Sequence, residues 1–374
     1  MEIGVVIGTR PEAIKMIPII IALRKKNIFV KVINTGQHKE MIDVIFMDFG
    51  IVYDYNLKVM LPDQSLSDLA SILCTKLDQF FKIHNFDFIL VHGDTLTCFV
   101  ASITAFWNKI KVAHIEAGLR TYNLNSPFPE EMNRQLTSRI ASIHFAPTQT
   151  AVNNLIKEGI DENKIILCGN SVIDALLIIR QRIQTISSLL KKIELSLDPK
   201  IINWPNKIIL ITAHRRENFG DNLIDFASAI NELSKKYPDI LFVYPVHLNP
   251  NVKNVIFNNV NSNGNISLIS PVDYKTFVYL MEKSHIIITD SGGIQEEAPS
   301  LGKPVLVLRD TTERQEALDK GCAKLIGMNK LSIIFEVSLL IDSDKEYNKM
   351  SNVSNPFGSG NTADIISDYF LNLA

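Results

Sequence analysis

The chain has 374 residues, of which 46% are hydrophobic, and this is enough apolar material for the cores of two domains rather than one. Its 38 basic and 40 acidic residues give a net charge of -2, which excludes a broadly basic surface for nucleic acid or for an anionic membrane. An anionic ligand must therefore be bound by cations that are concentrated locally.

The cysteines and the N-terminal residues indicate the compartment. Cys74, Cys98, Cys168 and Cys322 are far apart and form no C-x-x-C pair, so we expect reduced thiols. The first residues, MEIGVVIGTRP, lack a basic region, and their apolar run is too short to cross a bilayer. We therefore expect a cytoplasmic protein that begins with a strand and has no membrane partner.

The first strand, residues 3–8, runs into the sequence GTRPEAIKMIP, where Thr9 can cap a helix and Pro11 can occupy its first turn. Arg10 and Lys15 lie near this helix start, where cations oppose the helix dipole unless an anion intervenes. They predict an anion-binding site in which Arg10 holds a phosphate through two hydrogen bonds.

The stretch FDFILVHGDTLTCFVASITAFWNKIKVAHIEAGLR predicts two strands around one helix. Alternation places His92 and Asp94 on one face at the end of the first strand, and His114 and Glu116 on one face at the end of the second. Neighbouring parallel strands end side by side, so these four side chains converge at the edge where open α/β sheets bind ligands.

Two chemical uses of these side chains remain open. The histidines and acids could ligate a divalent metal, or the acids could transfer protons. We expect no metal, because the spacing lacks a recognised set of ligands, and we expect His92 and His114 to be buried and satisfied by backbone groups. A further carboxylate follows two prolines in SPFPEEMNRQ, as Glu130 or Glu131.

The second half again alternates strands and helices, and two such halves predict an α/β fold with two Rossmann-like domains facing each other across a cleft. We expect residues 1–170 to form the first domain, completed by a C-terminal helix in 357–374, and residues 171–356 to form the second. The strand in KIILITAHRRENFG ends in another anion-binding cluster, formed by His214, Arg215 and Arg216.

The stretch HIIITDSGGIQEEAPSLGKPVLVL has the order strand, turn, helix, strand. Gly292 and Gly293 let a ligand approach the backbone, and a helix beginning at Ile294 would direct its free N–H groups at a phosphate. Glu297 can accept hydrogen bonds from a ribose diol. A phosphate and a diol together indicate a nucleotide.

The chain resembles the non-hydrolysing UDP-N-acetylglucosamine 2-epimerases in motifs that occur in order and at matching intervals up to about Gly327, namely GTRPEAIKMIP, VHGDTLT, HIEAGLRT, PFPEEMNRQ, GNSVIDAL, TAHRRENFG, YPVHLNPNV and TDSGGIQEEAPSLGKPVLVLRDTTER. The resemblance implies a GT-B fold and a homodimer. It implies reversible conversion of UDP-GlcNAc to UDP-ManNAc, which supplies ManNAc units for cell-surface polysaccharide, with no metal or nicotinamide cofactor.

The resemblance also assigns roles to matching positions. Asp94, Glu116 and Glu130 are expected to transfer protons, and His214 is expected to lie at the diphosphate. The expected UDP contacts are Arg10, Gln64, Ser291, Gly292, Gly293, Glu297 and Arg314, with Phe277 near the uracil, although an isolated aromatic is on its own more often a core residue. We also expect Lys15 and Arg215 to bind the substrate, because both are cations in the predicted anion-binding clusters.

One departure from the family concerns regulation. Members that are activated by a second UDP-GlcNAc carry a Gln and an Arg where this chain has Glu40 and Asp63. Two acids would repel another diphosphate sugar, which argues against this activation although Gln37, Arg215 and His247 are retained.

The expected reaction follows from the chemistry of C2. The C2 proton of a GlcNAc unit is not adjacent to a carbonyl, so we expect UDP to leave first, giving 2-acetamidoglucal, and to add back after reprotonation. The alternatives are a 2-epimerase of a related UDP-2-acetamido sugar, a GT-B glycosyltransferase and a non-catalytic nucleotide-sugar sensor. A glycosyltransferase would leave the paired strand-end acids Asp94 and Glu116 unexplained, and a sensor would bind UDP-GlcNAc without turning it over.

Overall fold

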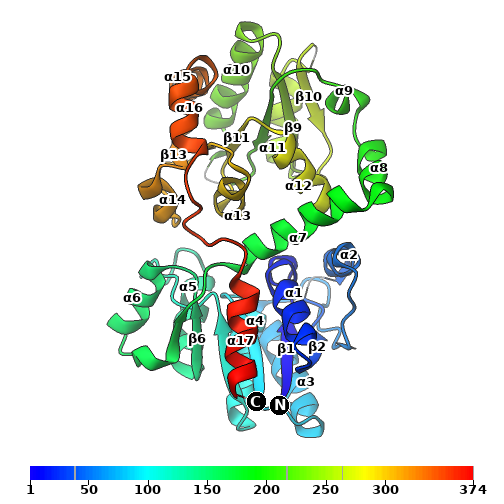
Figure 1. The fold of residues 1–374 in the computed structure, drawn as a ribbon, viewed down its shortest axis with the longest axis vertical. Coiled ribbons are helices and arrows are strands. Elements are labelled where there is room, and N and C mark those ends of the chain that lie inside the picture. The colour runs from blue at the N-terminus through cyan, green and yellow to red at the C-terminus, as the bar shows by residue number, and fades with distance from the viewer. Residues whose placement is uncertain (38, 216–217, 263, 374) are drawn as a thin grey trace. The chain divides into compact units, whose positions relative to one another are not determined.

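The computed structural model describes residues 1–37, 39–215, 218–262 and 264–373 (Figure 1). It has two parallel sheets with helices, which confirms the expected α/β class. Contacts divide the chain into a first unit, Met1–Ile178 with Phe357–Ala374, and a second unit, Ile179–Pro356. The division falls within helix α7 (Ser171–Thr185), whereas the boundary expected from the sequence precedes this helix.

The first unit is built on a sheet in the order β3-β2-β1-β4-β5-β6-β7, in which all neighbours are parallel. The order reverses direction between β1 and β4, and this is the place where open α/β sheets bind ligands beyond the carboxyl ends of their strands. Its strands are β1 (Glu2–Ile7), β2 (Phe29–Asn34), β3 (Tyr55–Asn56), β4 (Phe88–His92), β5 (Lys111–Ile115), β6 (Ile143–Ala146) and β7 (Ile165–Leu167).

Helices cover this sheet, and the last one comes from the C-terminus. Helix α17 (Thr362–Leu373) lies beside α1 (Figure 1), and the fully buried ring of Phe370 lies 5.3 Å from that of Phe88 and 5.9 Å from that of Phe145. The other helices are α1 (Arg10–Lys25), α2 (Lys39–Phe49), α3 (Leu66–Ile83), α4 (Leu96–Trp107), α5 (Glu130–Ile140), α6 (Gln149–Lys157) and the first part of α7.

The second unit has a sheet in the order β10-β9-β8-β11-β12-β13, again with parallel neighbours, and its order reverses between β8 and β11. Its strands are β8 (Ile208–Thr212), β9 (Leu241–Pro245), β10 (Ile266–Ile269), β11 (Ile286–Thr289), β12 (Val305–Val307) and β13 (Ala323–Leu325). Its helices are α8 (Ser187–Ser196), α9 (Pro199–Ile202), α10 (Asp221–Lys236), α11 (Pro250–Asn259), α12 (Tyr274–Lys283), α13 (Gly292–Glu297), α14 (Gln315–Lys320), α15 (Lys330–Asp342) and α16 (Asp344–Ser351).

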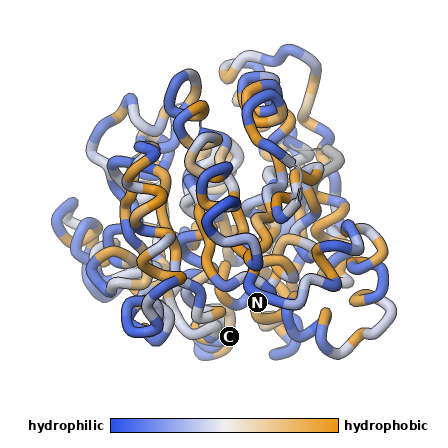
Figure 2. Tube along the Cα trace, turned by 90° about the horizontal axis from the view of Figure 1, so that it is seen from above, coloured by the Kyte–Doolittle hydropathy of each residue, from blue (hydrophilic) through white to orange (hydrophobic). Residues whose placement is uncertain are grey.

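The central strands are continuous apolar runs because helices cover both faces of a parallel sheet. Strand β4, with the sequence FILVH, and strand β11, with the sequence IIIT, are buried along their whole length. Figure 2 shows hydrophobic residues along the inner segments and hydrophilic residues at many of the outer turns. The polar residues that follow these strands are therefore held on a rigid base.

The structure corrects one helix start. Helix α13 begins at Gly292, with Ser291 as its N-terminal cap, and not at Ile294 as expected. In the described part of the chain, no helix has both the length and the apolar character needed to span a membrane.

Candidate active site

A cavity of about 380 Å³ lies in the first unit at the ends of β1, β4 and β5. Three predicted catalytic carboxylates line it, because Asp94 follows β4, Glu116 follows β5 and Glu130 begins α5. The full lining is Thr9, Pro11, Glu12, Lys15, Gln37, Leu66, His92, Asp94, Thr95, Leu96, Glu116, Pro129, Glu130 and Asn133.

Glu116 is held by several polar groups. Lys15 from α1 contacts its carboxylate, Nδ2 of Asn170 donates to Oε2 at 2.7 Å, and Nε2 of His92 lies 3.8 Å from the same oxygen. The backbone φ angle of Glu116 is 62°, in the left-handed region that a side chain with a Cβ rarely adopts. A non-glycine residue stays there only where its surroundings enforce it, and such residues cluster at functional sites.

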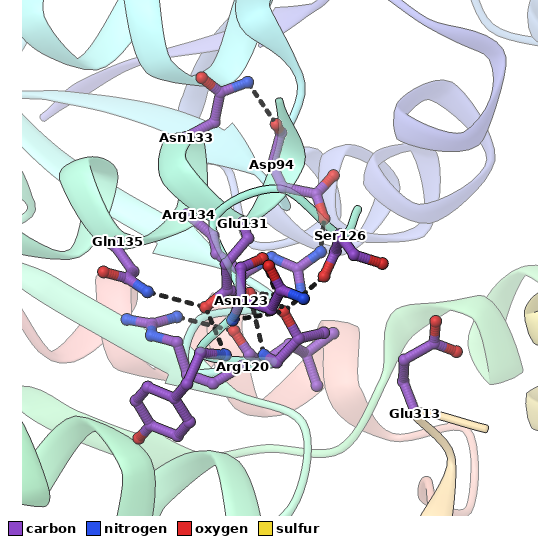
Figure 3. Close-up of polar contacts among 12 residues, drawn as sticks. Asp94, Arg120, Asn123, Ser126, Glu131, Asn133, Arg134, Gln135 and Glu313 are labelled. Atoms are coloured by element: carbon purple, nitrogen blue, oxygen red, sulfur yellow. Dashed lines mark hydrogen bonds and ion pairs between the residues drawn. The ribbon is translucent and has the colours of Figure 1, made fainter. Parts of the chain in front are cut away.

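Asp94 is paired with a cation that the sequence analysis missed. Arg134 contacts Oδ2 of Asp94, and Nδ2 of the neighbouring Asn133 donates to its main-chain oxygen at 2.9 Å (Figure 3). Burial raises the pKa of the Asp94 carboxyl group, and the charge of Arg134 only partly opposes this effect, while the charges of Glu116 and Glu130 add to it. Asp94 is therefore suited to exchanging a proton with a ligand.

The structure distinguishes the two adjacent glutamates that the sequence left open. Glu131 is fully buried and accepts hydrogen bonds from the main-chain N–H groups of Thr121 (2.9 Å) and Tyr122 (3.0 Å). Nε2 of Gln135 also donates to it at 2.8 Å (Figure 3). Glu131 thus shapes the loop before α5, whereas Glu130 lines the cavity.

Both histidines are buried, and each has one ring nitrogen without a hydrogen-bond partner among the described residues. Nε2 of His114 lies 2.7 Å from the main-chain oxygen of Gly93, as expected, but its Nδ1 has no partner. Nε2 of His92 has no partner either, so the expectation of backbone satisfaction is wrong for these two atoms. Burial lowers the pKa of His92 to about 4 and that of His114 to about 3, so both rings are neutral at neutral pH.

Glu12 is a second residue that the sequence analysis missed. Its Oε2 accepts hydrogen bonds from the main-chain N–H groups of Gly8 (2.9 Å) and Thr9 (2.7 Å), and the Thr95 hydroxyl donates to Oε1 at 2.6 Å. The signal was the T-x-x-E spacing of a capping box, formed by Thr9 and Glu12. Glu12 connects the turn that carries Arg10 to the turn that follows Asp94.

The remaining predicted residues of the first unit are Arg10, which is the first residue of α1, and Gln64. Gln64 makes contacts within its own loop, because its side chain accepts from the N–H of Leu61 (3.1 Å) and donates to the carbonyl of Val59 (3.0 Å). It is not part of the cavity lining. Asp63 is exposed, while the side chain of Glu40 lies outside the described part of the structure.

In the second unit, the predicted nucleotide residues gather after β11. Ser291, Gly292 and Gly293 form the start of α13, and a Cβ atom added to Gly292 would lie 3.0 Å from Cζ of Arg314. Glycine at this position thus lets the guanidinium pack against the turn. A Cβ on Gly293 would meet nothing within 4 Å, so the fold itself does not require the second glycine.

Three further predicted nucleotide-binding side chains, those of Arg314, Glu297 and Phe277, also belong to the second unit. Arg314 donates from Nε and Nη2 to Oε1 of Glu296, at 3.0 and 2.9 Å. Glu297 is buried and accepts a hydrogen bond of 2.5 Å from the Tyr274 hydroxyl, while Phe277 is half-buried on α12. Arg314 and Glu297 therefore already have protein partners that a bound nucleotide would share or replace.

His214 and Arg215 follow β8, and their main-chain N–H groups donate to Asp290 at 2.7 and 2.8 Å. Arg216, the third member of this cluster, lies outside the described residues. Among the residues that are described, no three or more His, Cys, Asp and Glu side chains form a group that could hold a metal ion. The expectation of a metal-free site stays a prediction.

Comparisons with known proteins agree over nearly the whole chain. A family model for UDP-N-acetylglucosamine 2-epimerase matches residues 21–371. The UDP-N-acetylglucosamine 2-epimerase of Neisseria meningitidis is 50% identical over 372 residues, which are 99% of each chain. The crystal structure of a UDP-GlcNAc 2-epimerase from the same species, bound to UDP-GlcNAc, matches with a TM-score of 0.90 at 50% identity and covers 100% of both chains.

A more distant solved structure agrees as well. The UDP-GlcNAc 2-epimerase of Methanocaldococcus jannaschii, in complex with UDP-GlcNAc and UDP, matches with a TM-score of 0.81 at 33% identity and covers 100% of both chains. These matches confirm the GT-B-like fold class expected from the sequence. The chain belongs to the UDP-N-acetylglucosamine 2-epimerase family.

Proposed function

We propose that this chain is an isomerase that interconverts UDP-GlcNAc and UDP-ManNAc without net hydrolysis. The observation that supports this most directly is the cavity that Asp94, Glu116 and Glu130 line together, with Lys15 beside them. A reaction that removes a proton and returns it to another face needs several positioned acids and bases. The substrate is inferred from the family, since the relatives described above were crystallised with UDP-GlcNAc or UDP.

The reaction begins with departure of UDP. No carboxylate can remove the C2 proton of a GlcNAc unit unaided, because no carbonyl is adjacent to stabilise the carbanion. As the C1–O bond breaks, positive charge develops at C1 and the C2 proton becomes acidic, so that elimination gives UDP and 2-acetamidoglucal. Cations at the diphosphate therefore act on the transition state as well as on binding.

The carboxylates of the first unit then share the proton transfers. Epimerisation requires the C2 proton to leave from one face of the ring and to return to the other, which a single carboxylate does not easily reach. Asp94, with its raised pKa, can hold a proton between the two steps, while Lys15 balances the charge of Glu116. Arg134 fixes the position of the Asp94 carboxylate.

The second unit supplies the nucleotide-binding residues in this proposal. Ser291, Gly292 and Gly293 present backbone to the phosphates, and Arg314, which lies against Gly292 and pairs with Glu296, can share its guanidinium with an anion. Glu297 is the acceptor for the ribose diol, with Phe277 near the uracil. His214 and Arg215 contribute further positive or polar contacts to the diphosphate, and Arg10 is the cation expected from the first unit.

The test is product analysis in D₂O. The purified protein, incubated with UDP-GlcNAc, is expected to give a mixture with UDP-ManNAc in which C2 carries deuterium, because the proton passes through groups that exchange with solvent. Retention of the C2 hydrogen at full conversion would point to a hydride or carbon-skeleton route. Transfer of the sugar to an added acceptor would favour the glycosyltransferase, and binding without turnover would favour the sensor.

We also propose that the enzyme is a cytoplasmic homodimer. The large exposed side chains of Ile83 (76%), Phe106 (60%) and Trp107 (61%) at the ends of the neighbouring helices α3 and α4 support an interface in the first unit. The four cysteines are free, as expected in a reducing compartment. Light scattering of the purified protein tests the dimer, and cell fractionation tests the location.

A further inference from the structure

Asp290, the first residue after β11, is a fully buried carboxylate that holds the loop after β8. Its Oδ2 accepts three hydrogen bonds, from the main-chain N–H groups of His214 (2.7 Å) and Arg215 (2.8 Å) and from Nδ2 of Asn218 (3.1 Å). Burial would raise the pKa of Asp290, but the interactions with His214 and these N–H groups outweigh it and lower the pKa below its ordinary value. Asp290 is therefore ionised.

The other oxygen of this carboxylate faces an imidazole ring. Nδ1 of His214 lies 3.2 Å from Oδ1, within ion-pair distance but not aligned as a hydrogen bond, and Oδ1 makes no hydrogen bond in the described part of the chain. The His214 side chain is 41% exposed, so the rest of its ring remains accessible to a ligand. Among the described residues, the ring of His247 stacks on that of His214 at 5.5 Å and 20°, and Nε of Arg215 donates to the main-chain oxygen of Asp290 at 3.1 Å.

We propose that Asp290 makes His214 a cationic donor to the diphosphate of the nucleotide sugar. An unprotonated Nδ1 would direct its lone pair toward the negative oxygen 3.2 Å away, so the nitrogen that faces Oδ1 must carry a proton. A phosphate oxygen also only accepts, so Nε2 must carry a second proton when His214 binds the diphosphate. The ring is then an imidazolium, and the buried charge of Asp290 balances it.

This inference rests on the proposed function for its catalytic consequence. When the C1–O bond breaks, its electron pair stays on the oxygen of the UDP β-phosphate, and an imidazolium beside this oxygen stabilises the new charge better than a neutral ring does. Asp290 is a positioning residue in this account, because it acts through His214.

Asp290→Asn isolates the effect of the positive charge on the His214 ring. The three donors at Oδ2 require an acceptor there, so the asparagine oxygen takes that place and its NH₂ group faces Nδ1 of His214. Nδ1 must then accept, and the ring becomes neutral with its single proton on Nε2. Such a ring still donates to a phosphate but carries no charge. The variant should bind the ground state and fail to stabilise the leaving group.

The direct test is ¹⁵N NMR of the His214 ring in the full chain, assigned with His214→Gln. In the wild-type protein Nδ1 should be protonated without ligand, and both nitrogens should be protonated with UDP. In Asp290→Asn only Nε2 should be protonated. An unprotonated Nδ1 in the wild-type protein, or a ring with only one proton in the UDP complex, would overturn the proposal. The measurement on the wild-type protein decides the question even where the variant does not fold.

Kinetics give a second readout. Asp290→Asn should lower kcat about a hundredfold and change KM by less than about threefold. In the His214→Gln background the same substitution should change kcat by less than about threefold, because its effect passes through the ring. A hundredfold loss of kcat on adding Asp290→Asn to both the wild-type and the His214→Gln protein would overturn the proposal.

Asn218→Ala is the structural control, because it removes one bond to the same oxygen and keeps the imidazole contact. A loss of kcat equal to that of Asp290→Asn would show that only loop rigidity matters and would overturn the proposal. A wild-type protein that binds UDP with a doubly protonated His214 but turns nothing over would refute the proposed function and leave the Asp290–His214 pair intact.

Discussion

Replacing Glu12 by Gln tests whether a buried carboxylate at the cavity costs stability at neutral pH. Glu12 is 1% exposed, and its two oxygens accept three hydrogen bonds. The amide oxygen of the introduced glutamine can accept from the same two N–H groups, and its NH₂ group can donate to the Thr95 hydroxyl. The substitution therefore keeps the shape and removes the charge.

The magnitude follows from the pKa. Burial raises the pKa of Glu12 from 4.5 to about 7, while the unfolded chain keeps the lower value. Between these values the folded protein binds a proton that the unfolded chain releases, so the free energy of unfolding falls as pH rises through this window. The contribution of Glu12 to the free energy of unfolding is fully present below pH 4.5 and is lost by about pH 7, a total change of roughly 3 kcal/mol.

The assay is urea unfolding at several pH values between 5 and 8. The chain has two tryptophans, Trp107 in the first unit and Trp204 in the second, so Trp204→Phe leaves a signal from the first unit alone. In this background, the protein with Glu12 should lose about 2 to 3 kcal/mol more than Glu12→Gln as pH rises. Other titrating groups cancel in the difference between the two proteins.

Asp68 provides a matched control. It occupies the same position in the capping box of α3, but its pKa is lowered, chiefly by hydrogen bonds with Ser65. The contribution of Asp68 to stability is lost only as pH falls below the ordinary pKa of 3.8. Between pH 5 and 8, the free energy of unfolding of Asp68→Asn should therefore change with pH as that of the parent protein does. If the free energy of unfolding of Glu12→Gln also changes with pH as that of the parent protein does, Glu12 is ionised at little cost and the reasoning from burial fails.

Three further outcomes are expected. Arg10→Ala and His214→Ala should each lower kcat about a hundredfold, because these groups meet charge that grows as UDP leaves; an effect on KM alone would limit them to ground-state binding. Activity should survive EDTA and dialysis, whereas loss on chelation with recovery on adding a divalent ion would reveal a metal site. UDP-ManNAc alone should be converted without a lag, because Glu40 and Asp63 disfavour a second sugar nucleotide; a lag abolished by trace UDP-GlcNAc would contradict this.

The sequence predicted the parts of the site that depend on the period of a strand. Asp94 and Glu116 were placed together because they follow buried strands, and β4 and β5 do pair in parallel as neighbours. The turn at Gly292 was recognised because backbone chemistry is local and glycine has few other uses there. Both inferences required only a few consecutive residues.

The partners of the carboxylates could not be predicted in the same way. Arg134 reaches Asp94 across 40 residues, and Asn170 reaches Glu116 across 54, through helix directions that no local pattern specifies. The left-handed backbone of Glu116 is likewise imposed by packing, since glutamate has no preference for it. Asp290 was passed over because its role depends on a loop that follows another strand, β8.

The three cavity carboxylates lead to the most direct test of the mechanism. Asp94→Asn and Glu116→Gln should each slow epimerisation by at least about a hundredfold, because each removes a group that carries a proton to or from C2. UDP should still bind, since its predicted contacts lie largely in the second unit. Glu131→Gln is the control for a neighbouring carboxylate, because Glu131 holds a loop, lies 3.6 Å from Arg134 and does not line the cavity.

The carboxylate variants should also differ in what they release. A variant that eliminates UDP but cannot return the proton lets the glucal outlive the bound state, so UDP and free 2-acetamidoglucal should accumulate in the reaction mixture. A variant that cannot remove the proton should release neither. NMR of the mixture with Asp94→Asn, Glu116→Gln and Glu130→Gln therefore assigns the two steps, and equal residual epimerisation by all three without any glucal would contradict a division of labour among these acids.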